Sequence, residues 1–354
     1  MDRRDFLKST GAAAAAATAV SSAATVTATS SLAAPAAVKG LQEFRLAMPW
    51  QEGCAGPADW ARRLGQNIAA MSNGRYRIVL EFGVADGLAG VREGAADLYF
   101  GGAHNLAQAP RGLAYFAGLP GDRGVSPQHL QTWISVGGGQ ALWDDLGGDI
   151  GIKPLLAAHT GAHSYLLAAE RIETMSALAG RKAQVHGLAR DVARGLGLDP
   201  VSLPPGQLAD AMQRGEVLAA ECGGAIVSYA LGLPSVAPYS AGASINRHGT
   251  ALFLGIRRSL WNSLGVDEQA MFTAAAAGEF QLSLAEEDAH RLLLHPEAPA
   301  ERTWPLAGEL AHAIRRVADA VVAHTAGSDP QTRRISDSFA AFRRAAVGGD
   351  AALA

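Results

Sequence analysis

The sequence has little of what marks a nucleic-acid-binding or disulfide-rich protein. In 354 residues, 30 Lys and Arg stand against 33 Asp and Glu, the formal net charge is −3, and no basic block occurs. A nucleic-acid partner is therefore not expected. The chain has only two cysteines, Cys54 and Cys222, in different segments. They could pair in an exported protein, but a chain of this size does not need one disulfide for stability, and both stand where we expect ligand-side residues.

The signatures of common enzymes are missing as well. The chain has no G-x-S-x-G nucleophile elbow, no H-E-x-x-H and no paired C-x-x-C. The triplet Gly137-Gly138-Gly139 has neither a preceding strand nor the Lys-Ser/Thr of a phosphate loop. Cys222 beside Glu221 could in principle form a thiol site with a histidine, but a lone cysteine at a strand end is more often a small apolar residue. We therefore expect that the protein is not an enzyme.

Residues 1–34 have the pattern of a targeting segment rather than of folded structure. Paired Arg3 and Arg4 precede Phe-Leu-Lys, as in twin-arginine export signals, and an Ala-rich run follows. The run is interrupted by Thr and Ser and is too weakly apolar to span a membrane, and residues 32–34 offer a cleavage context. We expect a cleaved twin-arginine signal peptide and a periplasmic protein; the alternative is an uncleaved disordered tail.

The remaining chain alternates short apolar runs of strand type with segments of helical spacing, which predicts an α/β fold. The expected strands lie at residues 43–50, 75–82, 94–100, 152–158, 164–169, 183–185, 201–203, 217–220 and 251–256. The expected helices lie at residues 57–72, 87–93, 128–146, 188–196, 207–214, 266–294 and 306–325, with a closing helix around 335–342.

The stretch from residue 176 to residue 224 is the most informative part of the chain. One predicted strand, residues 183–185, has Gln184 and His186 at its end, and another ends at Glu221 and Cys222. Ligands of open α/β sheets bind beyond the carboxyl ends of the strands. These four side chains are therefore candidate ligand contacts.

The same stretch carries a family resemblance. Its residues are Leu178, Gly180, Lys182, Gly187, Leu196, Gly197, Val201, Leu203, Pro204, Ala211, Gly215, Ala219, Ala220 and Glu221. A strand-helix-strand unit near the start of the chain adds Trp50 at its first strand end and Ser72-x-Gly74-Arg75 after its helix. The chain resembles the solute-binding proteins of TRAP (tripartite ATP-independent periplasmic) transporters, in particular the branch that binds 2-oxo acids, from about Phe44 to Phe342.

The resemblance implies a two-lobed periplasmic-binding-protein fold, in which each lobe is a β-sheet flanked by helices and long helices close the chain. We expect residues 35–157 to form the first part of lobe 1, residues 158–260 to form lobe 2, and residues 261–354 to return as helices that complete lobe 1. Such a protein captures a small organic solute by hinge closure and delivers it to membrane permease subunits, and some relatives form homodimers. The alternative is an exported sensing or scaffold protein of the same fold.

The resemblance also assigns site residues. The family holds a carboxylate through a bidentate arginine, and this branch adds a cation, usually sodium, held by a glutamine, a glutamate and the following tryptophan. The arginine position is Gln184, the glutamine position is His163, the glutamate is Glu221 and the tryptophan is Cys222. Gln184 cannot supply the two charge-assisted hydrogen bonds of an arginine. The loss of that bidentate pair would weaken carboxylate binding roughly ten- to several-hundred-fold.

Three outcomes follow from the changed residues. The solute is neutral or cationic and faces Glu221, or Arg181 or Arg247 has taken over the lost arginine's role, or a softer metal binds His163, Cys222 and Glu221. The expected solute contacts are completed by residues that flank the strand ends, namely Trp50, His186 and Asn246.

Overall fold

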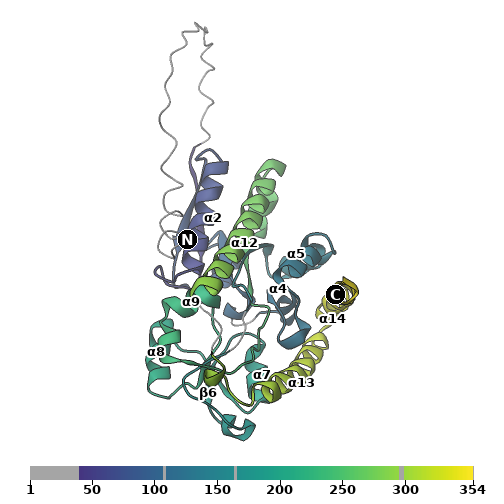
Figure 1. Ribbon diagram of the computed structural model, residues 1–354. Helices are drawn as coiled ribbons and strands as arrows, with labels where there is room; N and C mark the ends of the chain where they lie inside the picture. Colours follow the sequence, from purple (N-terminus) through teal and green to yellow (C-terminus); the bar gives the residue numbers. More distant parts are fainter. Residues whose placement is uncertain (1–39, 107–108, 163–165, 295–298, 354) are drawn as a thin grey trace, which may run out of the picture. The chain divides into compact units, whose positions relative to one another are not determined.

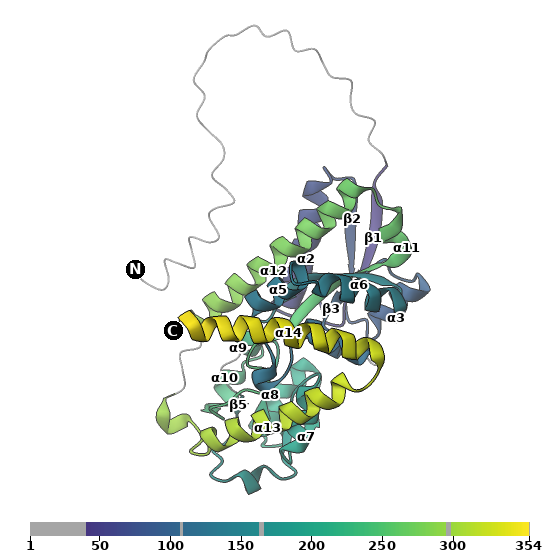
Figure 2. The ribbon, with the colours of Figure 1, turned by 90° about the vertical axis from the view of Figure 1, so that its right-hand side faces the viewer.

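The computed structural model describes residues 40–106, 109–162, 166–294 and 299–353, and the predicted signal peptide lies outside them. Figure 1 and Figure 2 show two groups of strands with helices packed around each. Both sheets have five strands, which agrees with the predicted α/β architecture.

The first sheet has the strand order β2-β1-β3-β10-β4. Its strands are β1 (Gln42–Ala47), β2 (Tyr76–Glu81), β3 (Leu98–Gly101), β4 (Ile152–His159) and β10 (Ala251–Arg257). β1 runs parallel to β2 and β3, whereas β10 is antiparallel to β3 and β4. The carboxyl ends of β1 and β3 therefore lie together at one edge, which receives the loops that follow them.

The position of β10 differs from the expectation that residues 251–256 belong to lobe 2, which was wrong. The apolar run did predict the strand, but periodicity does not say which sheet a strand joins. β4 is buried along its whole length, so its backbone N–H and C=O groups need a partner strand, and that partner is itself buried and apolar. β10, buried from Ala251 to Ile256, is that partner.

The second sheet has the order β7-β6-β8-β5-β9. Its strands are short: β5 (Leu167–Ala168), β6 (Lys182–Gln184), β7 (Asp199–Val201), β8 (Ala219–Ala220) and β9 (Tyr239–Ser240). β6 is parallel to both β7 and β8, while β5 is antiparallel to β8 and β9. Gln184 pairs in register with Ala220, so the ends of β6 and β8 coincide.

Helices cover both sheets. They are α2 (Pro57–Met71), α3 (Gly87–Glu93), α4 (Ala114–Ala117), α5 (Pro127–Ser135), α6 (Gly139–Asp149), α7 (Ala189–Gly195), α8 (Pro205–Gln213), α9 (Gly224–Ala230), α10 (Leu233–Val236), α11 (Arg258–Ser263), α12 (Val266–Leu294), α13 (Ala307–Ala326) and α14 (Pro330–Leu353). Short 3-10 turns are η1 (Ala103–Asn105), η2 (Arg111–Leu113), η3 (Gly121–Arg123), η4 (Met175–Leu178) and η5 (Ala300–Arg302). Within the described ranges, no helix combines the length and apolar character that a membrane crossing requires.

From the sequence, all the closing helices are expected to return to the first sheet. The structure shows that not all of them do. α12 packs on β4 and α2, and Figure 2 shows α14 beside α5 and α6. α13, however, places Leu310 and Ile314 in the core of the second sheet and contacts α7. Its apolar stripe predicted a packed helix but not which core would receive it. The exact residue boundaries of the two lobes stay a prediction.

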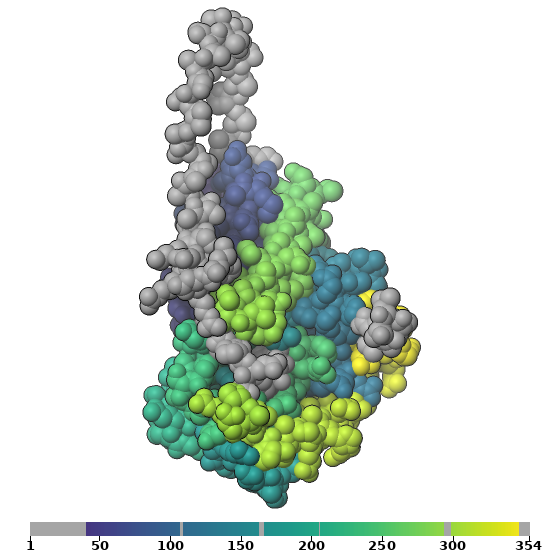
Figure 3. Space-filling view, viewed as in Figure 1, coloured from purple at the N-terminus to yellow at the C-terminus, as the bar shows by residue number. Residues whose placement is uncertain are grey.

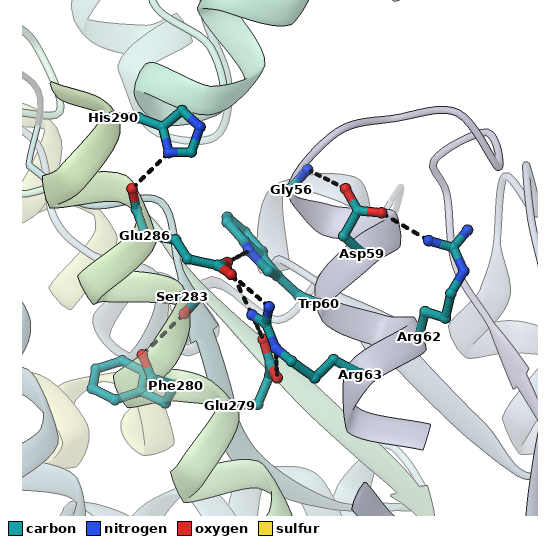
Figure 4. A network of polar contacts seen from close by, with 10 residues as sticks. All are labelled: Gly56, Asp59, Trp60, Arg62, Arg63, Glu279, Phe280, Ser283, Glu286 and His290. Carbon is teal, nitrogen blue, oxygen red and sulfur yellow. Dashed lines mark hydrogen bonds and ion pairs between the residues drawn. The ribbon is translucent and has the colours of Figure 1, made fainter. Parts of the chain in front are cut away.

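A buried ion-pair network joins α2 to α12 (Figure 4). The guanidinium of Arg63 donates to both carboxylate oxygens of Glu279 at 2.6 and 2.8 Å and to those of Glu286 at 2.6 and 2.9 Å. The indole of Trp60 donates to Glu286 at 3.0 Å. Glu279 is fully buried, and burial raises the pKa of its carboxyl group. Figure 3 shows the surface of α12 in light green beside the purple residues of α2.

We expect Arg63→Leu to lower the free energy of unfolding by about 2–3 kcal/mol, because Glu279 would remain buried without its counter-charge. This figure is below that of a fully buried pair because the Arg63 side chain keeps 25% of its exposure. Urea unfolding of the mature protein measures the change. The neighbouring Arg62→Leu, which removes an exposed pair with Asp59, is the matched control and should cost less than about 1 kcal/mol. Equal effects of the two changes would contradict the role of the network.

Candidate functional site

A cavity of about 300 Å³ lies where loops from both sheets meet. It is lined by Trp50, Gln184, His186, Glu221, Cys222 and Asn246, which are six of the seven residues predicted to contact the solute. The seventh, His163, lies outside the described residues. The structure therefore brings the six together, whereas their contact with a solute stays a prediction.

Strand ends explain how distant residues meet here. Gln184 is the last residue of β6, and Glu221 directly follows β8, which is its parallel neighbour. Trp50 follows β1 in the first sheet, and its ring packs edge-on against Phe100 of β3, with centroids 6.3 Å apart. The rule that ligands bind beyond the carboxyl ends of strands thus locates the cavity correctly.

Glu221 has a different role from the predicted one of facing the solute. Its carboxylate is 5% exposed and accepts hydrogen bonds from the Ser244 hydroxyl at 2.8 Å, from Ile245 N at 2.9 Å and from Asn246 N at 2.6 Å. These donors satisfy much of the charge of a buried carboxylate. Glu221 therefore fixes the 244–246 loop at the cavity wall, and it does not stand ready as the anchor for a cationic solute.

Gln184 is likewise tied into the wall. It is 3% exposed, and its amide oxygen accepts a hydrogen bond from Leu203 N at 2.9 Å. This bond connects the end of β6 to the chain that leaves β7. Because the amide oxygen is engaged, the NH2 group is what Gln184 can offer to a solute.

A second histidine, His104, was missed by the sequence analysis. It lies in η1, just after β3, and its ring centroid is 5.5 Å from that of His186. Burial, with a smaller contribution from His186, lowers the pKa of His104 to about 3. Burial, with a smaller contribution from Arg190, lowers the pKa of His186 to about 4. Both imidazoles are neutral at pH 7, and the strand-end rule applied to β3 would have found His104.

The two cysteines line the same cavity as free thiols. Burial is the main cause that raises the pKa of Cys54 to about 11, with a smaller contribution from Asp59. Burial and the nearby Glu221 raise the pKa of Cys222 to about 12. Both groups therefore stay protonated at neutral pH, and a protonated thiol is a poor nucleophile and metal ligand.

Comparison with known proteins identifies the family. Residues 126–324 match the family model of bacterial extracellular solute-binding proteins, family 7 (DctP). The chain belongs to this family. The match covers more than half of the chain and includes the second sheet, β4 and β10.

Individual relatives extend the likeness over nearly the whole chain. This family 7 protein is 24% identical over 352 residues to a monocarboxylate 2-oxoacid-binding periplasmic protein of Nostoc sp., covering 97% of this chain and 94% of the relative. Among solved structures, a TRAP periplasmic solute-binding protein of Pseudoalteromonas atlantica with sodium and pyruvate bound has a TM-score of 0.75, at 21% identity and coverage of 87% and 95%. A TRAP solute-binding protein of Bordetella bronchiseptica, a dimer with calcium and picolinate, has a TM-score of 0.77, at 20% identity and coverage of 87% and 94%. The predicted family and two-lobed fold are thereby confirmed, and the homodimer stays a prediction.

Neither arginine proposed to replace the lost one lines the cavity of this family 7 protein. Arg181 forms an ion pair with Glu170, and Arg247 pairs with Asp122 at 3.0 Å. Within the described ranges, no Lys or Arg contributes to the cavity wall. The second of the three predicted outcomes therefore finds no support in the geometry.

The described residues also do not assemble a metal site. They contain no group of three or more His, Cys, Asp or Glu that could hold a metal ion. Cys222 is protonated, and both Glu221 oxygens already accept hydrogen bonds. A site made of His163, Cys222 and Glu221 for a soft metal, or of Glu221 and His163 for sodium, stays a prediction because His163 is not described.

We expect Glu221→Gln to lower the free energy of unfolding by about 2–3 kcal/mol, because an amide nitrogen cannot accept a hydrogen bond from the buried N–H groups of the 244–246 loop. Urea unfolding monitored by tryptophan fluorescence measures the loss. The matched control is Glu216→Gln, an exposed carboxylate that pairs with Arg214, and we expect no measurable change there. A native-like stability of Glu221→Gln would show that the carboxylate does not hold this loop.

The histidine pair predicts a pH dependence of stability. An unfolded histidine has a pKa near 6.5, whereas the folded values are about 3 and about 4. Between pH 6.5 and 4 the unfolded chain binds more protons, so the free energy of unfolding must fall as the pH falls through this window. The double variant His104→Asn/His186→Asn should flatten this slope in urea unfolding at pH 7.5, 6 and 5, whereas the exposed control His312→Asn should not. An unchanged slope in the double variant would argue against buried neutral imidazoles.

Proposed function

We propose that this family 7 protein is the solute-binding subunit of a TRAP-type secondary transporter. It is exported to the periplasm by the twin-arginine signal, captures a small organic solute in the 300 Å³ cavity and delivers it to membrane permease subunits. The observation that carries the proposal is that the strand-end loops of both sheets converge on one cavity. The proposal assigns no covalent step to any side chain of the described cavity wall.

Two of the segments in which the chain passes between the sheets lie against each other, and these are the proposed hinge. Thr160 N donates to Thr250 O at 3.0 Å, and Thr250 N donates to the Thr160 hydroxyl at 2.9 Å. Next to them, Gly161 and Gly249 have φ of 68° and 76°, and a Cβ on Gly249 would come within 1.7 Å of Gly161 O. Only glycine permits this approach, and paired crossings of this kind let two lobes rotate as bodies.

The relatives suggest the size of the solute more firmly than its charge. Pyruvate and picolinate, bound in the two solved relatives, are small carboxylates, and the Nostoc relative is described as binding monocarboxylate 2-oxoacids. The cavity here suits a molecule of that size. In this chain, however, Gln184 occupies the position at which the resemblance places the arginine that holds the carboxylate.

A thermal-shift screen of the mature protein tests the function. It covers 2-oxo acids, other organic acids, amides, polyols and cationic solutes, each with and without a chelator. A solute at one hundred times its Kd should add about 2.7 kcal/mol of stability, which corresponds to a Tm rise of several degrees. A shift that disappears with chelator would reveal a bridging cation. No shift across the screen would favour the sensing or scaffold alternative.

A further inference from the structure

The walls of the cavity carry almost no charge. Among the described residues that line it, Glu221 is the only Asp, Glu, Lys or Arg, and three donors from the 244–246 loop hold its carboxylate. The pKa of each lining histidine is well below 7, and the pKa of each lining thiol is well above it. The described wall of the cavity therefore offers no cation to a solute.

An ionised carboxylate would bind at a disadvantage in such a place. Transfer of a carboxylate out of water is costly unless a counter-charge or several donors replace its hydration. Here the described wall holds no Lys or Arg as a counter-charge, and the NH2 group of Gln184 supplies only a neutral donor. The same group in its uncharged amide form loses far less hydration and needs no counter-charge.

The polar groups that remain suit an uncharged molecule. A neutral imidazole carries one donor and one acceptor, so His104 and His186 can complement both the N–H or O–H and the C=O of one solute. His104 follows a strand of the first sheet and His186 follows a strand of the second, and their rings lie 5.5 Å apart. They therefore approach the solute from the two sides that close on it. Leu203 and Trp50 add apolar surface.

Building on the proposed function, we propose that this cavity selects an uncharged, hydrogen-bonding solute such as a small primary amide or polyol. It rejects the corresponding carboxylate at neutral pH. His104 and His186 form the hydrogen bonds that distinguish the two solutes.

The positive charges nearest to the histidines lie on their other side. A second cavity of about 380 Å³ shares His104 and His186 with the first and is also lined by Arg111, Arg190 and Asp191. The guanidinium of Arg190 donates to the carbonyl oxygens of Val201 at 3.1 Å and Pro200 at 3.0 Å. These cations therefore do not enter the wall of the first cavity, and the charged groups that face the histidines are Glu221 on one side and these three on the other.

Calorimetric titration with matched pairs tests the proposal on the full mature protein. The pairs are pyruvate with pyruvamide and lactate with lactamide, at pH 7.5 with chelator, and glycerol and erythritol extend the neutral series. We expect each amide to bind at least about thirtyfold more tightly than its acid, the size of one lost charge-assisted hydrogen bond. A carboxylate that binds as tightly as its amide would overturn the inference and leave the proposed function standing. Failure of every compound to bind would overturn both.

Variants locate the effect. Gln184→Arg places a cation in the wall and should raise affinity for pyruvate at least about tenfold, whereas Gln207→Arg, which adds the same charge at an exposed position of α8, should not.

His104→Asn and His186→Asn should each weaken amide binding at least about tenfold, with circular dichroism confirming the fold. Pyruvate binding to the unmodified protein that is lost in Arg190→Ala would place the anion in the second cavity and overturn the inference.

Discussion

The paired crossing of the chain between its two sheets is the constraint on which the rest of the structure depends. Thr160 N donates to Thr250 O, Thr250 N donates to the Thr160 hydroxyl, and Gly249 lies so close to Gly161 that no side chain fits there. Next to this crossing, Glu287 of α12 accepts hydrogen bonds from Ala225 N at 2.7 Å and Ile226 N at 3.3 Å in α9. Helix α12, which packs on the first sheet, is thereby connected to α9, the helix that follows Glu221 in the second.

Buried carboxylates in this protein are each held in a different way. Glu279 has the guanidinium of Arg63, Glu221 has two backbone N–H groups and a hydroxyl, and Glu287 has the backbone N–H groups of Ala225 and Ile226. For Glu287 these donors do not compensate burial, which raises its pKa to about 8, so the group keeps its proton at neutral pH. Each of these carboxyl groups is thus either held by donors or protonated. This agrees with the proposal that the cavity binds an uncharged solute.

Local patterns in the sequence predict most elements but not their partners. The alternation in β1 and the apolar stripe of α2 specify a strand and a helix because the period alone decides them. The sheet that receives β10 and the core that receives α13 depend on which faces remain uncovered elsewhere in the fold. For the same reason the cavity could be located from strand ends, whereas the satisfaction of Glu221 by residues 244–246 and the approach of His104 to His186 could not, since both join segments far apart in the chain.

The position of Gln184 shows why a family scaffold does not fix a family ligand. Its amide oxygen accepts from Leu203 N, a bond that an arginine could not make because guanidinium has no acceptor. Replacement of arginine by glutamine therefore has two effects at once. The wall gains a hydrogen bond between β6 and the chain after β7, and the cavity loses a cation. Because a buried N–H without a partner costs about 1–3 kcal/mol, this hydrogen bond favours glutamine independently of any solute. The glutamine is thus a structural member of a described wall that contains no Lys or Arg, and the proposed chemistry of the solute follows from that wall.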